Sequence, residues 1–216
     1  MCKRTVKMKT NLLYDIDIRK TLCEELHKQL PTKFKSMIIN ELMVGESIAD
    51  VSVITEKNVS LFEIKSDMDS LVRLPKQVRD YDAVGDYCSL VTTDTFLQKI
   101  QDQFLIPDHW GILKASSIDG QVILESVRQP VYSPEVNPDY LAHSLWSDEL
   151  IEHLTDINSL YGVKSKNNWY KRQRLIENTT TNELKRIYRN SHLKRGNWRD
   201  NNTIIIGEVK SEYERL

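Results

Sequence analysis

Three short apolar runs follow one another between residues 37 and 65, and their spacing restricts the folds open to this chain. MIINELMV (37–44), ADVSVI (49–54) and VSLFEIK (59–65) are rich in β-branched residues, and turn residues separate them. Connections this short join antiparallel neighbours, so the three runs predict a β-meander.

Helical patterns flank this meander. Apolar residues recur mostly every four positions from 15 to 30, where Pro31 ends the helix, and a second helix is predicted from 71 to 84. YCSLVTT (87–93) follows as a further strand. The order α-β-β-β-α-β predicts an α/β (α+β) protein with a mixed sheet covered by helices.

The remaining sequence divides near residue 129. A helix at 94–103 and strands at 110–116 and 121–127 extend the sheet, and the proline-spaced segment QPVYSPEVNP (129–138) is typical of a linker. Helical patterns then cover 140–154, 168–178 and 181–194, and Thr180-x-x-Glu183 at the start of the last has the form of a capping box. We therefore expect a core with a sheet extension over 1–128 and a mostly helical, basic region over 129–216.

The composition is that of an ordinary globular protein. Of the 216 residues, 40% are hydrophobic and 28% are charged, which argues against a disordered chain or a coiled coil. No apolar run approaches the roughly 18 to 20 residues that cross a bilayer, so we expect no membrane insertion. Cys2, Cys23 and Cys88 form no CxxC pair, and we expect a cytoplasmic protein without a disulfide framework.

Charge is distributed unevenly along the chain. Residues 1–10 carry four basic and no acidic side chains (+4), residues 11–163 carry 13 and 25 (−12), and residues 164–199 carry 11 and two (+9). A cationic segment beside an acidic body is typical of an arm that binds a polyanion, although a solvated helical surface has the same composition.

The residues that carry chemistry lie on the second and third runs. Alternation places Glu63 and Lys65 on one face of their strand. A two-residue turn at 56–57 puts Asp50 opposite Glu63, because the same register pairs Val51 with Phe62 and Ala49 with Ile64 and keeps Ala49, Val51 and Val53 on one apolar face.

Two opposed carboxylates about 5 Å apart repel each other unless a cation lies between them. Mg²⁺ or Mn²⁺ suits this set, because such ions take oxygen ligands from one or two carboxylates, waters and a substrate phosphate. Lys65 can then orient the attacking water or stabilise the transition state. The chemistry that this indicates is phosphodiester hydrolysis.

With these residues the stretch 37–93 resembles the PD-(D/E)XK nuclease superfamily, which has a restriction-endonuclease-like fold. The resemblance implies that Asp50, Glu63 and Lys65 are catalytic, and that Glu41, Asp50, Glu63 and the Ile64 carbonyl hold the metal. Gln77 and Tyr81 match the Q-x-x-x-Y motif of the RecB-like branch, which lies beside the active site. The string from Glu63 to Tyr81 also resembles a group of bacterial and prophage proteins in this superfamily. Ala49 replaces the eponymous proline, at a position that is often variable.

The resemblance implies DNA as the substrate and partner, with RNA as an alternative. Arg73 would clamp a phosphate or pair with Asp69 or Asp80, and the basic region would neutralise phosphates through six residues: Lys171, Arg172, Arg174, Lys185, Arg186 and Arg189. A non-catalytic nucleic-acid-binding or interaction protein that retains the fold is the other interpretation. The sequence leaves open endonuclease or exonuclease action and assembly into a homo-oligomer.

Overall fold

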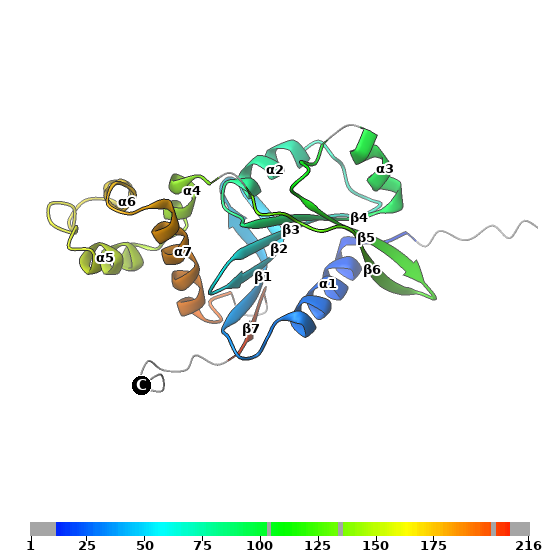
Figure 1. Ribbon diagram of the computed structural model, residues 1–216, viewed down its shortest axis with the longest axis horizontal. Coiled ribbons are helices and arrows are strands. Elements are labelled where there is room, and N and C mark those ends of the chain that lie inside the picture. The colour runs from blue at the N-terminus through cyan, green and yellow to red at the C-terminus, as the bar shows by residue number, and fades with distance from the viewer. Residues whose placement is uncertain (1–11, 103–104, 134–135, 200–201, 208–216) are drawn as a thin grey trace, which may run out of the picture.

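The computed structural model describes residues 12–102, 105–133, 136–199 and 202–207, and it confirms the predicted α+β class. α1 (Asp15–Gln29) precedes three strands that pair as an antiparallel meander, β1 (Ser36–Val44), β2 (Ser47–Thr55) and β3 (Val59–Lys65). α2 (Leu74–Asp82) and β4 (Tyr87–Thr93) complete the expected α-β-β-β-α-β order (Figure 1).

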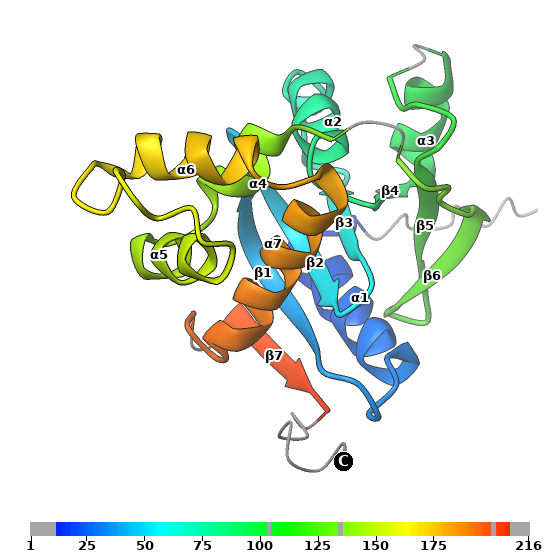
Figure 2. The same cartoon turned by 60° about the vertical axis from the view of Figure 1, so that its left-hand side comes forward.

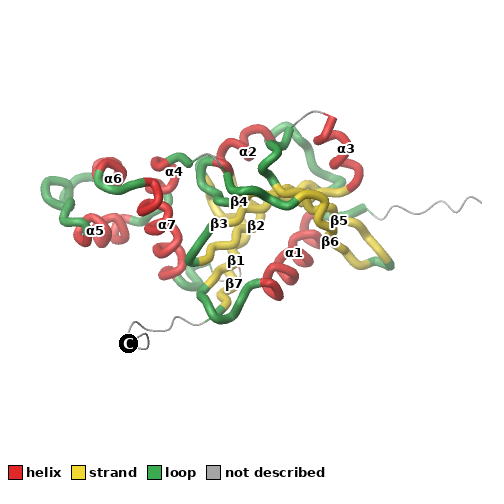
Figure 3. Tube along the Cα trace, in the orientation of Figure 1, coloured by secondary structure: helices red, strands yellow, loops and turns green. Residues whose placement is uncertain are grey.

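The sheet continues beyond β4, as the sequence predicts. α3 (Asp94–Asp102) leads to the hairpin of β5 (Gly111–Ile118) and β6 (Gln121–Arg128). The described strands form one sheet in the order β6-β5-β4-β3-β2-β1-β7, in which the β3–β4 and β4–β5 pairs are parallel (Figure 3).

Helices cover both faces of the sheet, and each face has its own hydrophobic cluster. α1 packs on one face, where Ile18 and Leu22 meet Val51, Phe62 and neighbouring strand residues. α2 and the helices that follow β6 share the cluster on the opposite face (Figure 1). β3, which pairs antiparallel with β2 and parallel with β4, is almost entirely buried, including its polar residues Glu63 and Lys65.

The region after residue 129 consists of four helices and a returning strand. The helices are α4 (Pro138–His143), α5 (Ser147–Asp156), α6 (Asn168–Glu177) and α7 (Thr181–Arg195). Figure 2 shows α7 across β1 and β2, with β7 (Thr203–Ile206) at the edge of the sheet, where it pairs antiparallel with β1. The domain boundary near 129 stays a prediction, although the helices after it share a hydrophobic cluster with the core.

The start of α7 agrees with the sequence prediction, whereas the helix predicted over 140–154 is divided in two. The Thr180 hydroxyl accepts from the Glu183 N–H, which confirms the predicted capping box at the start of α7. The helical pattern over 140–154 breaks into α4 and α5, because the Glu149 carboxylate accepts from the Trp146 N–H at 2.7 Å and begins a new helix there.

The β1–β2 hairpin lies directly against α4. Its turn contains Gly45, which has a φ of +59° and lies against the ring of Tyr140. Any Cβ at this position would overlap that ring, so glycine is required both for the turn and for the close approach. No described helix has the length and apolar character needed to span a membrane.

Candidate active site

The β2–β3 pair has the register that the sequence predicts. Val51 lies opposite Phe62, and the ladder runs from there to the turn. Beyond this pair the Ile64 N–H donates to Asp50 Oδ2 at 2.7 Å instead of to a backbone carbonyl. The Asp50 carboxylate is therefore fixed at the point where the two strands separate.

The predicted alternation around Asp50 is wrong on one side. Val51 and Val53 pack against α1, whereas Ala49 packs in the cluster on the opposite face. The expected pairing of Ala49 with Ile64 is absent from the ladder, because the Ile64 N–H is bonded to the Asp50 side chain. Glu41 faces this point from β1 with a φ of +57°, a conformation that is uncommon for residues other than glycine.

Glu63 and Lys65 lie together in the interior, on the face that alternation predicts. Their side chains are 1% and 3% exposed, and the Lys65 ammonium pairs with Glu63 Oε1. The Tyr81 hydroxyl reaches Glu63 Oε2 from α2 and also lies 3.0 Å from the Ile48 carbonyl oxygen. Both oxygens of the Glu63 carboxylate therefore have donors within the chain.

Gln77 and Tyr81 share the buried side of α2, one helical turn apart. Burial, followed by the charges of Glu63 and Asp50, raises the pKa of Tyr81 well above its usual value, so its hydroxyl stays protonated and can donate. The Gln77 side-chain oxygen is buried and has no hydrogen-bond partner among the described residues. It is therefore an unused polar group on the helix that contacts Glu63.

Asp50 is the most perturbed carboxyl of the group. Burial and the nearby charge of Glu63 raise the pKa of Asp50 from its usual 3.8 to about 7. The Ile64 N–H and Arg19 oppose this rise without cancelling it. A cation between Asp50 and Glu63 would relieve the repulsion that raises the pKa.

Arg19 is a member of the site that sequence reasoning missed. It extends from α1, where Asp15 binds its guanidinium at 2.9 and 3.0 Å, and it lies 3.1 Å from Asp50 Oδ1 and 3.7 Å from Glu41 Oε1. It also donates to the Asp50 carbonyl oxygen. The Asp15 to Arg19 spacing of four residues was the available signal, but it does not show which strand the helix approaches.

A divalent metal needs several oxygen ligands, and few side chains supply them at this point. No group of three or more His, Cys, Asp or Glu side chains is arranged to hold an ion within the described ranges. The third expected carboxylate, Glu41, is 55% exposed and pairs with Arg19 instead. Asp50, Glu63 and the Ile64 carbonyl remain, and two carboxylates with waters fall within the usual set for Mg²⁺.

The predicted phosphate-binding residues are not gathered on one surface. Lys171 is buried, as is Lys185, whose ammonium lies 2.7 Å from both Asp86 Oδ1 and the Tyr132 hydroxyl. Arg189 lies near Asp86 and donates to the Glu56 carbonyl oxygen. Such buried pairs hold α7 on the core and leave those cations little freedom to bind phosphate.

The remaining predicted cations are more accessible. Arg172 and Arg174 are partly exposed and donate to carbonyl oxygens of His143 and Tyr161, while Arg186 is exposed on α7. Arg73 is exposed at the start of α2 and forms no ion pair with any residue that the structure describes. The basic segment 1–10 lies outside the described residues.

Comparison with known proteins places the chain in a family. A solved protein of unknown function from Silicibacter pomeroyi is similar over 87% of this chain and 94% of its own, with 16% identity and a TM-score of 0.40. Pyrococcus furiosus SfsA, solved in complex with Ca²⁺, is similar over 53% and 60%, with 18% identity and a TM-score of 0.30. No curated protein matches the sequence. The family model described as bacteriophage P4 protein cII matches residues 8–213, and the chain therefore belongs to that phage-related family.

Proposed function

We propose that this chain is a metal-dependent nuclease of the PD-(D/E)XK type that hydrolyses phosphodiester bonds in DNA. The observation that supports this proposal is the position of Asp50 where β2 and β3 separate, close enough to buried Glu63 that the charge of Glu63 helps to raise the pKa of Asp50. Lys65 pairs with Glu63 at the same point. Carboxylates on adjacent strands with an adjacent lysine are suited to hydrolysis assisted by a divalent ion.

Each residue has a role that follows from its contacts. Asp50, Glu63 and the Ile64 carbonyl would hold Mg²⁺ or Mn²⁺, with Glu41 as a further ligand once it leaves Arg19. A bound metal supplies a Lewis acid and lowers the pKa of its water. Lys65 would orient the attacking water and stabilise the charge that develops on phosphate. Tyr81 keeps the Glu63 carboxylate oriented through its hydroxyl, and Gln77, one turn earlier on α2, offers a buried side-chain oxygen without a partner among the described residues.

Arg19 is the residue that would lose its contact with Asp50 when a metal ion binds. In the absence of metal its guanidinium partly neutralises Asp50, and Asp15 can retain it when Asp50 turns to the ion. Because Asp50 has a pKa of about 7, the ion competes with a proton as well as with Arg19. Metal affinity and cleavage should therefore both increase as the pH rises through about 7.

Exposed cations near the site would contact the nucleic acid. Arg73 lies at the start of the helix that carries Gln77 and Tyr81, and we expect it to bind a phosphate near the scissile bond. Arg174 on α6 and Arg186 on α7 would contact phosphates elsewhere along the nucleic acid. Phosphate contacts of this kind do not depend on the base sequence of the nucleic acid, and they weaken as salt is added.

A non-catalytic nucleic-acid-binding protein is the second candidate, and one observation favours it. Every carboxylate of the site already has a cation within the chain, because Arg19 contacts Asp50 and Lys65 contacts Glu63. A protein of this kind would bind DNA in the absence of metal and would not cleave it.

The two candidates are separated by incubating labelled linear, circular and single-stranded DNA, and an RNA of the same sequence, with Mg²⁺, Mn²⁺ or EDTA. Metal-dependent products support the nuclease, and cleavage of circular DNA would identify endonuclease action. Binding without products in every metal condition would support the second candidate.

Replacing Arg73 by alanine should weaken DNA binding and reduce its salt dependence by about one phosphate contact.

A further inference from the structure

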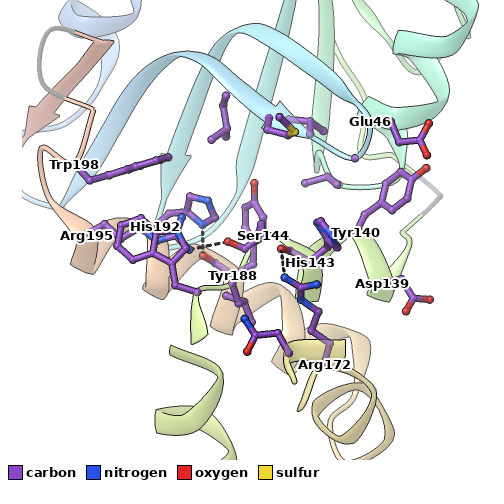
Figure 4. Close-up of a pocket in the computed structure, with 18 of the residues that line it drawn as sticks. Glu46, Asp139, Tyr140, His143, Ser144, Arg172, Tyr188, His192, Arg195 and Trp198 are labelled. Carbon is purple, nitrogen blue, oxygen red and sulfur yellow. Dashed lines mark hydrogen bonds between the residues drawn. The ribbon is translucent and has the colours of Figure 1, made fainter. Parts of the chain in front are cut away.

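A cavity of about 1030 Å³ lies away from the candidate active site, between the β1–β2 hairpin and the C-terminal helices. Its wall includes Gly45 and Glu46 from the hairpin, Tyr140 and His143 from α4, and Tyr188 and His192 from α7 (Figure 4). Asp50, Glu63 and Lys65 do not line it. The volume is at the upper end of the range typical of small-molecule sites.

Three side chains in this wall have hydrogen-bond donors that the chain does not satisfy. They are the Tyr188 hydroxyl, the Trp198 indole Nε1 and the Arg172 Nε, each buried and without a partner among the described residues. Tyr188 is 1% exposed. Buried polar groups are nearly always paired, so three unpaired donors around one cavity indicate a partner from outside the chain.

The charges of the cavity indicate an anion. Arg172 and Arg199 line it, and neither forms an ion pair with a carboxylate of the described residues. Arg195 is already held by Glu149 at 2.6 Å, and burial lowers the pKa of His192 to about 4, so these two add no free charge. Glu46 and Asp139 are exposed at the rim, where Lys76 and Gln173 contact them.

Aromatic rings provide the rest of the wall. Trp146 and Trp198 meet edge to face at 5.5 Å, and the Arg195 guanidinium lies 4.3 Å from the Trp146 ring centre, which holds the two indoles in place. Trp146 is 42% exposed and Trp198 is partly buried. A planar ring packs favourably against such a surface, either offset-stacked or edge to face.

We propose that this cavity is a binding site for a nucleoside 5′-monophosphate, a ligand that joins a planar base to a small anion. The phosphate oxygens accept from Tyr188, Arg172 and Arg199, and the base packs on the exposed indole of Trp146, with the perpendicular ring of Trp198 at its edge. Phosphate fits the polar wall because it offers several acceptors to donors that come from separate elements. The proposal does not depend on the nuclease assignment, because the two sites share no residue.

Titration of the full chain with adenosine 5′-monophosphate, followed by calorimetry and by tryptophan fluorescence, tests the site. EDTA keeps divalent ions from the carboxylate site, and adenosine and inorganic phosphate are titrated separately. We expect saturable binding of the monophosphate and at least about tenfold weaker binding of either part alone. Absence of saturable binding at millimolar monophosphate would overturn the proposal, and equal binding of inorganic phosphate would overturn the nucleotide assignment.

Tyr188→Phe removes one unpartnered hydroxyl without changing the shape of the ring. It should weaken monophosphate binding about tenfold and leave the stability of the empty protein unchanged or higher, because that hydroxyl has no partner in the chain. Tyr161→Phe is the matched control, since Tyr161 is 93% exposed and lies outside the cavity. Unchanged affinity in Tyr188→Phe, or an equal loss in Tyr161→Phe, would contradict the site.

Discussion

Asp50→Asn should make the metal-free protein more stable above neutral pH. The ionised carboxyl of Asp50 is buried beside Glu63, and these two causes raise its pKa from 3.8 to about 7. Asparagine keeps the shape of the side chain and an oxygen for the Ile64 N–H, but it carries no charge. The substitution therefore removes the repulsion and retains the hydrogen bond.

The sign and size of the effect follow from linkage. Because the folded pKa of Asp50 lies above its unfolded value, the folded state holds the proton between about pH 4 and pH 7, and stability falls as pH rises through that window. A rise of about three pKa units corresponds to at most about 4 kcal/mol. The Asp50 side chain is 21% exposed and contacts Arg19, so we expect about 1 to 3 kcal/mol.

Urea unfolding in EDTA, followed by tryptophan fluorescence near pH 5 and pH 8, measures this difference. Asp50→Asn should gain stability over wild type at pH 8 and much less at pH 5. Asp17→Asn, an exposed change on the same helix as Arg19, should show no such dependence. If Asp50→Asn loses stability more at pH 8 than at pH 5, Arg19 stabilises the ion, and the reasoning about repulsion is refuted.

Three further results are expected. Mg²⁺ should raise the melting temperature of wild type near pH 8 but not that of Asp50→Asn, and equal shifts in thermal unfolding would place the ion elsewhere. Tyr81→Phe should lower the unfolding free energy by about 1 to 3 kcal/mol, because the buried Glu63 loses a donor, and an unchanged urea midpoint would contradict that contact. His192, whose pKa is lowered to about 4 by burial, contributes stability that is present above its unfolded pKa of 6.5 and is lost as pH falls toward 4. His192→Gln should therefore reduce the dependence of the urea midpoint on pH over that window. An unchanged dependence on pH would count against a buried neutral histidine.

Local patterns predicted the central elements of the fold closely. The strands at 59–65 and 87–93 have the predicted bounds, because turn residues mark both ends of each apolar run. The β2–β3 register was predictable because only one pairing puts apolar Val51 opposite apolar Phe62, although the alternation expected beyond Val51 fails at Ala49. The proximity of Asp50 to Glu63 followed from that register.

Contacts between distant segments were not predictable from local patterns. Arg19 reaches Asp50 across 31 residues, and the spacing within α1 does not reveal which strand the helix covers. Lys185 meets Asp86 across 99 residues, which buries a cation that charge counting places at the surface. The strand at 203–206 is apolar enough to recognise, but its pairing with β1 depends on the path of the four helices before it.

Two matched substitutions test whether Lys65 acts in phosphodiester hydrolysis. Lys65→Met and Lys185→Met each remove a buried lysine from a buried carboxylate, at side chains that are 3% and 7% exposed, so both should cost several kcal/mol of stability. Cleavage of labelled DNA in Mg²⁺ is measured at a temperature where circular dichroism shows both variants folded. We predict wild-type cleavage in Lys185→Met and a loss of about a hundredfold or more in Lys65→Met. Equal rates in the two variants, or no cleavage by wild type, would contradict the account.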